Sequence, residues 1–187
     1  MIQRIKGTQT RSAETRSAIL AAVERLWRER PYDAITIAQI AAEAGIAKGS
    51  VLAHFSEKLA ILAGFLAQEL DRTSAALATD PDFAITPQRL AAKFAPLLHF
   101  LAADKALLRL LTLDGDGEQC SIVLDPATAR LRAGLVAGFA RQQQDNPELC
   151  ADVFLAIAIQ VAVSGHAQDS AAAVAALARL AGIVYRA

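Results

Sequence analysis

The stretch TIAQIAAEAGIAKGSVLAHF, residues 36–55, decides how this chain folds. Thr36 is a favourable N-cap for a short helix, and Gly45 stands where a left-handed residue commonly ends one. At most three residues, beginning with Gly45, separate this helix from a second and shorter one that ends near His54. Two short helices joined by such a glycine-containing turn have the spacing of a helix-turn-helix motif.

The second of these helices has one apolar side and one small polar side. Val51 and Phe55 lie at helical spacing, and we expect them to pack inward. A helix enters the major groove, about 12 Å wide, with small and polar outer residues. An ordinary solvated helical turn is the alternative reading. The outward residues are Lys48, Gly49, Ser50 and His54, of which the glycine lets the helix approach a sugar–phosphate strand closely.

The formal net charge of zero conceals an uneven distribution. Residues 1–58 hold nine Lys/Arg and six Asp/Glu, a balance of +3, whereas residues 59–187 hold ten and thirteen, a balance of −3. This asymmetry indicates that the N-terminal end meets a polyanion, although a solvated basic tail would have the same composition. In the first sixteen residues, Glu14 is the single acid and the cations are Arg4, Lys6, Arg11 and Arg16.

Residues 36–62, TIAQIAAEAGIAKGSVLAHFSEKLAIL, resemble the N-terminal domain of the tetracycline-repressor (TetR-like) transcriptional regulators. The shared pattern is Thr, an Ile-Ala pair, Ala-Gly-Ile, Lys-Gly-Ser, His-Phe and a lysine that opens the fourth helix, and the likeness covers roughly residues 11–70. It implies an all-α homodimer of about nine helices. Residues 1–56 would form a three-helix DNA-binding helix-turn-helix domain, and residues 57–187 a helical ligand-binding and dimerisation domain.

The resemblance also implies which residues contact double-stranded DNA at a near-palindromic operator. In the family pattern, most of these contacts are made to phosphates. One departure stands out, because the family usually has a tyrosine where this chain has Leu52, and that hydroxyl donates to a phosphate. Leucine cannot, so we expect a contact worth about 1 kcal/mol to be lost. The positions carried over are Thr36, Lys48, Ser50, His54 and Lys58, with Gly49 at the close-approach position and Arg4 and Lys6 in the basic arm.

The remainder of the chain reads as further helices with one long break. Apolar periodicity predicts helices near residues 90–101, 105–111, 127–143, 148–164 and 170–185, with a polar loop at 114–126. The last two are apolar on nearly every side, so both must be covered. A second subunit is the expected cover, giving a homodimer through these two helices, and an internal core is the alternative.

The resemblance places an effector site between the fourth helix and the helices that follow it. Few polar groups lie among the candidates, which favours a small, mainly hydrophobic effector. His99 could orient such a molecule, or could be an ordinary surface or core histidine. The candidate lining residues are Leu66, Phe94, Leu97, Leu98, His99, Leu108, Leu111, Leu135 and Phe139.

Several classes of function are not favoured by the sequence. It lacks a Gly-rich phosphate loop, a Cys-x-x-Cys pair and a nucleophile elbow, so we expect no enzyme activity, cofactor or metal. The acidic run beginning at Asp114 has EF-hand spacing, but Gln119 occupies the position that needs glycine. A small helical enzyme without a recognisable motif, and a helical dimeric adaptor that does not bind DNA, remain as alternatives.

The expected location is the cytoplasm, away from the membrane. No apolar run reaches the roughly 18 residues of a membrane span, and the start lacks the apolar stretch of a signal peptide. Cys120 and Cys150 are the only two cysteines, too few for a disulfide framework, and we expect both to be reduced.

Overall fold

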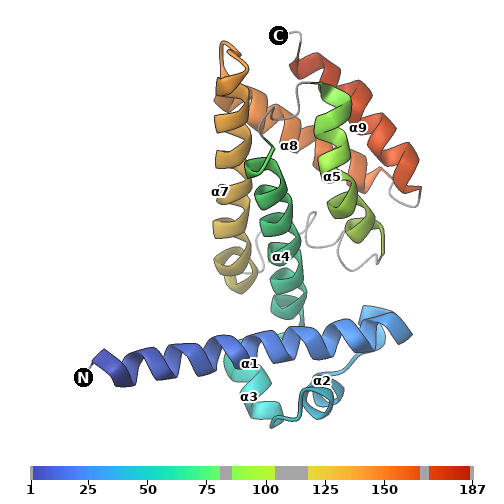
Figure 1. The fold of residues 1–187 in the computed structure, drawn as a ribbon. Coiled ribbons are helices and arrows are strands. Elements are labelled where there is room, and N and C mark those ends of the chain that lie inside the picture. Colours follow the sequence, from blue (N-terminus) through green and yellow to red (C-terminus); the bar gives the residue numbers. More distant parts are fainter. Residues whose placement is uncertain (1, 81–85, 104–117, 165–168, 186–187) are drawn as a thin grey trace. The chain divides into compact units, whose positions relative to one another are not determined.

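The computed structural model describes residues 2–80, 86–103, 118–164 and 169–185, and every regular element within these ranges is helical (Figure 1). The predicted all-α class is therefore confirmed. The chain divides into two compact units, Met1–Phe65 and Leu66–Ala187, and α4 (Lys58–Ala78) contributes residues to both. The helix expected near residues 105–111, with Leu108 and Leu111, lies outside the described residues.

The N-terminal unit begins with one long helix followed by short ones. The order is α1 (Ile2–Glu29), a 3₁₀ turn η1 (Tyr32–Ala34), α2 (Ile37–Ala44), α3 (Lys48–His54) and the start of α4. Its core contains fully buried aliphatic side chains from each helix: Ile19, Val23, Ile40, Val51 and Ile61. The helices are therefore held by a shared apolar centre.

The single tryptophan of the chain belongs to this core. The ring centroid of Trp27 lies 5.4 Å from that of Tyr32 and 5.8 Å from that of Phe65. The Tyr32 hydroxyl donates a 2.5 Å hydrogen bond to the carbonyl of Lys58. An aromatic cluster thus joins the end of α1, the 3₁₀ turn and the first part of α4.

Local backbone chemistry fixes both ends of α2. Thr36 and Gln39 form a capping box, in which the Thr36 hydroxyl accepts from the Gln39 N–H and the Gln39 side chain accepts from the Thr36 N–H. Gly45 has φ +68°, and the Ile46 N–H donates to the Ala41 carbonyl across the turn. Both the predicted cap and the predicted glycine stop are present, so α2 and α3 are set three residues apart.

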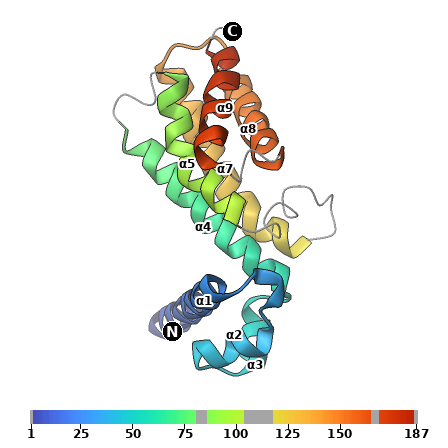
Figure 2. The same ribbon diagram turned by 90° about the vertical axis from the view of Figure 1, so that its right-hand side faces the viewer.

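The C-terminal unit is built from longer helices. After its part of α4 come α5 (Pro87–Ala103), α7 (Glu118–Arg141), α8 (Pro147–Val163) and α9 (Ser170–Val184). Helix α9 lies along α5, and α8 contacts both α7 and α9 (Figure 2). The rings of Phe94 and Phe154 meet edge to face at 4.9 Å in the core. Arg130 pairs bidentately with Asp71 at 2.8 and 2.9 Å, tying α7 to α4.

Helix α7 corrects one expectation from the sequence. The polar loop predicted at residues 114–126 is wrong over its second half, because α7 already begins at Glu118 and contains Pro126. A proline inside a helix leaves the carbonyl four residues earlier without its donor, and that residue, Ile122, is 60% exposed, so water reaches this turn. Helical backbone from Glu118 onward also excludes an EF-hand loop ending at Asp125.

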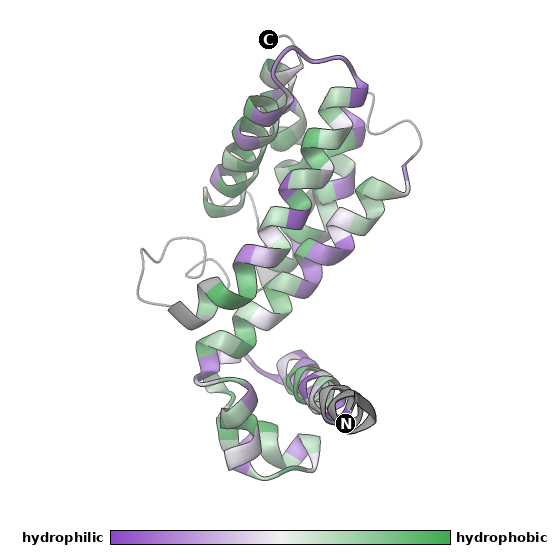
Figure 3. Cartoon of the chain, turned by 90° about the vertical axis from the view of Figure 1, so that its left-hand side faces the viewer, coloured by the Kyte–Doolittle hydropathy of each residue, from purple (hydrophilic) through white to green (hydrophobic). Residues whose placement is uncertain are grey.

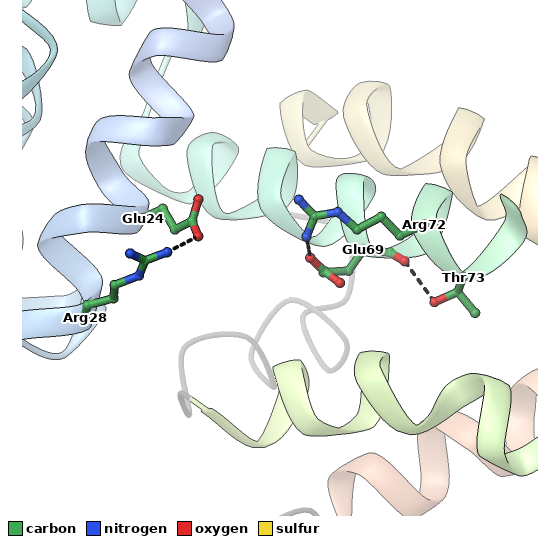
Figure 4. Close-up of polar contacts among 5 residues, drawn as sticks. All are labelled: Glu24, Arg28, Glu69, Arg72 and Thr73. Carbon is green, nitrogen blue, oxygen red and sulfur yellow. Dashed lines mark hydrogen bonds and ion pairs between the residues drawn. The ribbon is translucent and has the colours of Figure 1, made fainter. Parts of the chain in front are cut away.

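Exposed helix faces carry local polar contacts, shown in Figure 4. Arg28 pairs with Glu24 one turn earlier on α1 at 2.7 Å, and Arg72 pairs with Glu69 on α4. The buried hydroxyl of Thr73 donates to the Glu69 carbonyl at 2.9 Å, so it does not lose a hydrogen bond on burial. Such surface pairs are worth little individually, and the fold rests on its buried contacts.

In the described part of the chain, no single helix is both long and apolar enough to cross a membrane, and only the bent pair α3 and α4 meets that test by length and composition. Cys120 and Cys150 are both buried, and neither forms a disulfide.

Candidate functional site

Helix α3 separates its residues between an inner and an outer side, as predicted. Val51 and Phe55 are 0% and 1% exposed and hold the helix in the core. Lys48 and Gly49 are exposed, and Ser50 and His54 are half-buried at the edges of the outer face. Leu52 and Ala53 complete the exposed face. The outer face therefore carries one cation, small residues and one large apolar side chain.

The two predicted lysine contacts differ in what their ammonium groups do. Within the described residues, Lys48 has no hydrogen-bond or ion-pair partner, so its charge is available to an outside anion. Lys58 donates to the Asp33 carbonyl at 3.0 Å and lies 4.7 Å over the Tyr32 ring. Thr36 is exposed, but its hydroxyl is engaged in the capping box. Of these three, Lys48 has the most freedom to bind something else.

Nothing in the described part of the fold requires glycine at position 49. Its φ is not positive, since Gly45 is the positive-φ glycine of the described residues. A Cβ added at Gly49 would meet nothing within 4 Å. Glycine inside a helix costs about 1 kcal/mol relative to alanine. A small residue here is consistent with a close approach by something outside the chain.

Arg16 is not a free cation of the basic N-terminal segment. Its guanidinium carbon lies 4.2 Å from the centre of the Phe55 ring, and its burial lowers the pKa of the guanidinium. Gly64 on α4 leaves room for this contact, because an added Cβ would lie 3.1 Å from Phe55 and 3.5 Å from Arg16. Arg16 thus packs against Phe55 at the end of α3. The side chains of Arg4 and Lys6 lie outside the described residues.

An apolar cavity of about 130 Å³ lies in the C-terminal unit, among α4, α5, α7 and α8. Among the described residues that line it, Thr128 is the only polar one and none is charged. An engineered apolar cavity of about 150 Å³ holds benzene, so this volume suits a small hydrocarbon group. The lining residues are Leu66, Leu70, Phe94, Leu97, Leu98, Leu101, Leu124, Thr128, Leu131, Leu155, Ala158 and Ile159.

The structure brings together four of the candidate effector residues: Leu66, Phe94, Leu97 and Leu98. Leu135 and Phe139 are fully buried but do not line the cavity. Phe139 instead packs edge to face on Tyr185 at 5.8 Å, and burial raises the pKa of that tyrosine to about 12. His99 is exposed on α5 and does not reach the lining either.

Sequence reasoning missed most of the α7 and α8 walls of the cavity. Leu124 fell inside the polar loop predicted at residues 114–126, and Thr128 fell in the first turn of the helix predicted after it. Leu155 and Ile159 lie on a helix so uniformly apolar that no pattern distinguishes its cavity side. Only Leu131 had a usable signal, since it repeats at helical intervals with Leu135.

The last two helices also leave apolar side chains exposed. In Figure 3 the two helices nearest the C-terminal mark are green, or hydrophobic, over most of their length. Leu149 and Ile183 are each 57% exposed, and with Val153 they line one shallow depression. The exposed large hydrophobic residues of α8 and α9 are Leu149, Val153, Ile159, Val163, Leu180 and Ile183.

Comparison with known sequences singles out the helix-turn-helix region. Residues 19–64 match the sequence model of the bacterial regulatory proteins of the tetR family. A 57-residue stretch is 40% identical to the HTH-type transcriptional repressor BepR of Brucella suis. That stretch is 30% of this chain and spans 27% of the length of BepR.

Solved structures of tetR-type regulators share the fold across both units. FadR of Thermus thermophilus, solved with lauroyl-CoA, has a TM-score of 0.64 and 20% identity, over 91% of this chain and 93% of its own. FadR of Bacillus subtilis, solved with stearoyl-CoA, has a TM-score of 0.62 and 16% identity, over 90% and 96%. The helix-turn-helix region of this chain thus matches the tetR family of bacterial regulatory proteins, and the chain shares its fold with solved regulators of this type.

Proposed function

We propose that this chain is a ligand-responsive, homodimeric transcriptional repressor that leaves its operator when a small, mainly hydrophobic effector binds. The observation that carries the proposal is the outer face of α3, where an unpaired Lys48 stands beside Gly49. The match of residues 19–64 to the tetR-family model supports the same reading of that face.

In this proposal α3 enters the major groove of double-stranded DNA. Lys48 and Ser50 donate to phosphates or base edges, and His54 donates or accepts at the edge of the face. Gly49 lets the start of the helix come close to the sugar–phosphate strand. Thr36, Lys58, Arg4 and Lys6 are proposed as further backbone contacts, with Lys58 giving up or sharing its bond to Asp33.

A two-fold dimer would present two such helices to successive turns of the duplex, roughly 34 Å apart, on a near-palindromic site. The exposed apolar side chains of α8 and α9 support a dimer through these helices, because hydrophobic patches of this kind commonly mark protein interfaces. A second subunit would remove them from water and form a four-helix contact.

The cavity among α4, α5, α7 and α8 is the proposed effector site. The described part of its lining holds no charged residue, which favours an uncharged or mainly hydrocarbon ligand. Release requires the ligand to favour a state in which the two reading heads no longer match the operator. A difference in affinity of a few kcal/mol between the two states is sufficient. The proposed setting is the cytoplasm, with no enzymatic role.

Selection of duplexes from a random-sequence library tests the DNA-binding part directly. We expect enrichment of a near-palindrome, bound with an affinity that falls steeply as salt rises. Absence of salt-sensitive DNA binding at low ionic strength would instead favour the alternative, a helical dimeric adaptor that does not bind DNA.

A thermal-shift screen tests the effector class. Small hydrophobic compounds should raise the melting temperature, because they bind the folded state only. A screen in which only polar, charged metabolites stabilise the protein would refute a hydrophobic effector.

A further inference from the structure

Leu52 is the one large hydrophobic side chain that the N-terminal unit leaves exposed, counted over residues 11–65, whose side chains are described. It is 41% exposed. It lies one helical turn after Lys48 and Gly49, on the outer face of α3 that the proposed function places in the DNA groove. Every other large apolar residue between positions 11 and 65 is at least partly covered by the fold.

The surroundings of Leu52 determine what its side chain would meet. The neighbouring outward groups are the unpaired ammonium of Lys48, two residues with little or no side chain, Gly49 and Ala53, and the half-buried Ser50. A lone apolar residue among these is too small for a stable protein interface, which needs a contiguous apolar centre. The positive balance of residues 1–58 and the free Lys48 are complementary to a polyanion. The observations therefore favour DNA over a protein partner.

The major groove offers few apolar groups to a leucine. Its base edges present donors and acceptors, and in unmodified DNA its one apolar substituent is the C5-methyl group of thymine. A leucine placed against a donor or acceptor would strip that group of water without replacing its hydrogen bond. Against a thymine methyl, both partners leave water at no such cost.

We propose that Leu52 is a specificity-determining residue, which selects thymine at one position of each operator half-site by contact with its C5-methyl group. The inference rests on the proposed function, since it requires α3 to lie in the major groove. It gives the departure from the family's tyrosine a role, in which a phosphate hydrogen bond is exchanged for an apolar contact with a base.

Replacing thymine with uracil in the selected duplex removes only the methyl group and tests this directly. Each thymine of the half-sites is exchanged in turn, in symmetric pairs, and affinity is measured by fluorescence anisotropy at one fixed salt concentration. We expect one pair to weaken binding about fourfold for each methyl removed, and the other pairs to have little effect. Thymines outside the protected site serve as the control.

Two variants assign that effect to the leucine. Leu52→Ala should bind the thymine duplex more weakly and no longer distinguish it from the uracil duplex. Leu52→Met retains a long apolar side chain and should keep most of the distinction. Because Leu52 is exposed, both variants should melt near the parent temperature, which circular dichroism checks.

The outcomes separate this inference from the function on which it rests. If no duplex is enriched in the selection, the proposed function fails and this inference with it. If a duplex is enriched but no uracil exchange weakens binding, only the thymine contact is overturned. A methyl effect that persists undiminished in Leu52→Ala also overturns it, because another residue then makes the contact.

Discussion

Among the side chains that the structure describes, the N-terminal unit exposes one large hydrophobic residue and the C-terminal unit exposes seven. The first unit packs short helices around its core, and a capping box and one left-handed glycine fix the ends of α2. Its outer surface is suited to contact with water or a polyanion. The second buries Phe94, Phe139 and Phe154 fully and still leaves apolar residues outside along α8 and α9. The difference supports the proposal that α8 and α9 meet a second subunit, and the N-terminal unit leaves no comparable set of apolar residues exposed among its described side chains.

The largest expected effect tests whether the C-terminal unit has a sufficient core of its own. Phe139→Ala removes a fully buried ring that does not line the cavity, so we expect a loss of about 3–5 kcal/mol in the free energy of unfolding. Urea denaturation followed by circular dichroism measures it. Ile122→Ala, at a residue 60% exposed, is the control and should change stability by less than about 0.5 kcal/mol. Equal effects of the two substitutions would contradict the role given to Phe139 in the core of this unit.

The next largest effect tests which exposed apolar residues are covered by the proposed second subunit. Ile183→Glu places a charge on the α8 and α9 surface, where the side chain is 57% exposed. We expect the dimer dissociation constant to rise by about 30-fold or more, measured by analytical ultracentrifugation. Ile122→Glu introduces the same charge at an equally exposed isoleucine on α7 and should leave the dimer intact. If both variants dissociate equally, the α8 and α9 surface is not the specific interface.

Replacing either of two glycines in the N-terminal unit with alanine should change stability in opposite directions. Gly45→Ala forces a left-handed φ of 68° on a residue with a Cβ and should cost about 1–2 kcal/mol. Gly49→Ala meets no atom within 4 Å and should stabilise the protein by up to about 1 kcal/mol, yet weaken its affinity for the selected duplex. Thermal melts and anisotropy measure the two quantities. Unchanged DNA affinity in Gly49→Ala would remove the proposed close approach.

Two cations of the N-terminal unit should differ in role, one binding DNA and the other stabilising the fold. Lys48→Ala should weaken DNA binding and reduce the slope of log affinity against log salt by about 0.9 per subunit, with stability unchanged. Arg16→Ala should lower stability by about 1 kcal/mol through loss of its contact with Phe55, with the salt slope unchanged. An altered slope in Arg16→Ala would instead indicate that Arg16 contacts a phosphate.

The smallest effect concerns acid sensitivity in the C-terminal unit. Arg132 pairs with Asp152 at 2.6 and 2.8 Å and thereby lowers the pKa of that carboxyl. A lowered folded-state pKa gives stability that is present above the unfolded pKa, about 4, and is lost as pH falls through the folded value. Asp152→Asn should therefore flatten the loss of stability below about pH 4. Both side chains are largely exposed, so the difference is small, and a parallel loss in the variant would assign the acid response to other carboxyls.

The two units also differ in how far the sequence could predict them. Thr36, Gly45 and the apolar positions of α3 act through contacts a few residues apart, and both ends of α2 and the start and end of α3 follow from them. The walls of the cavity depend on which sides of α5, α7 and α8 meet, which a uniformly apolar helix does not reveal. Pro126 misled the prediction because an exposed helical turn tolerates a missing donor. Composition also counts Arg16 among the N-terminal cations without showing that the Phe55 ring covers it.

The lone indole of Trp27, set between Tyr32 and Phe65, has a practical consequence. Phe65 immediately precedes Leu66, which lines the apolar cavity, and both residues belong to α4. Any rotation or shift of that helix alters the environment of a single fluorophore, so its emission reports on one place in the molecule. We therefore expect tryptophan emission to change when an effector binds the cavity and shifts α4, so that a candidate could be titrated without a label and before any operator is known.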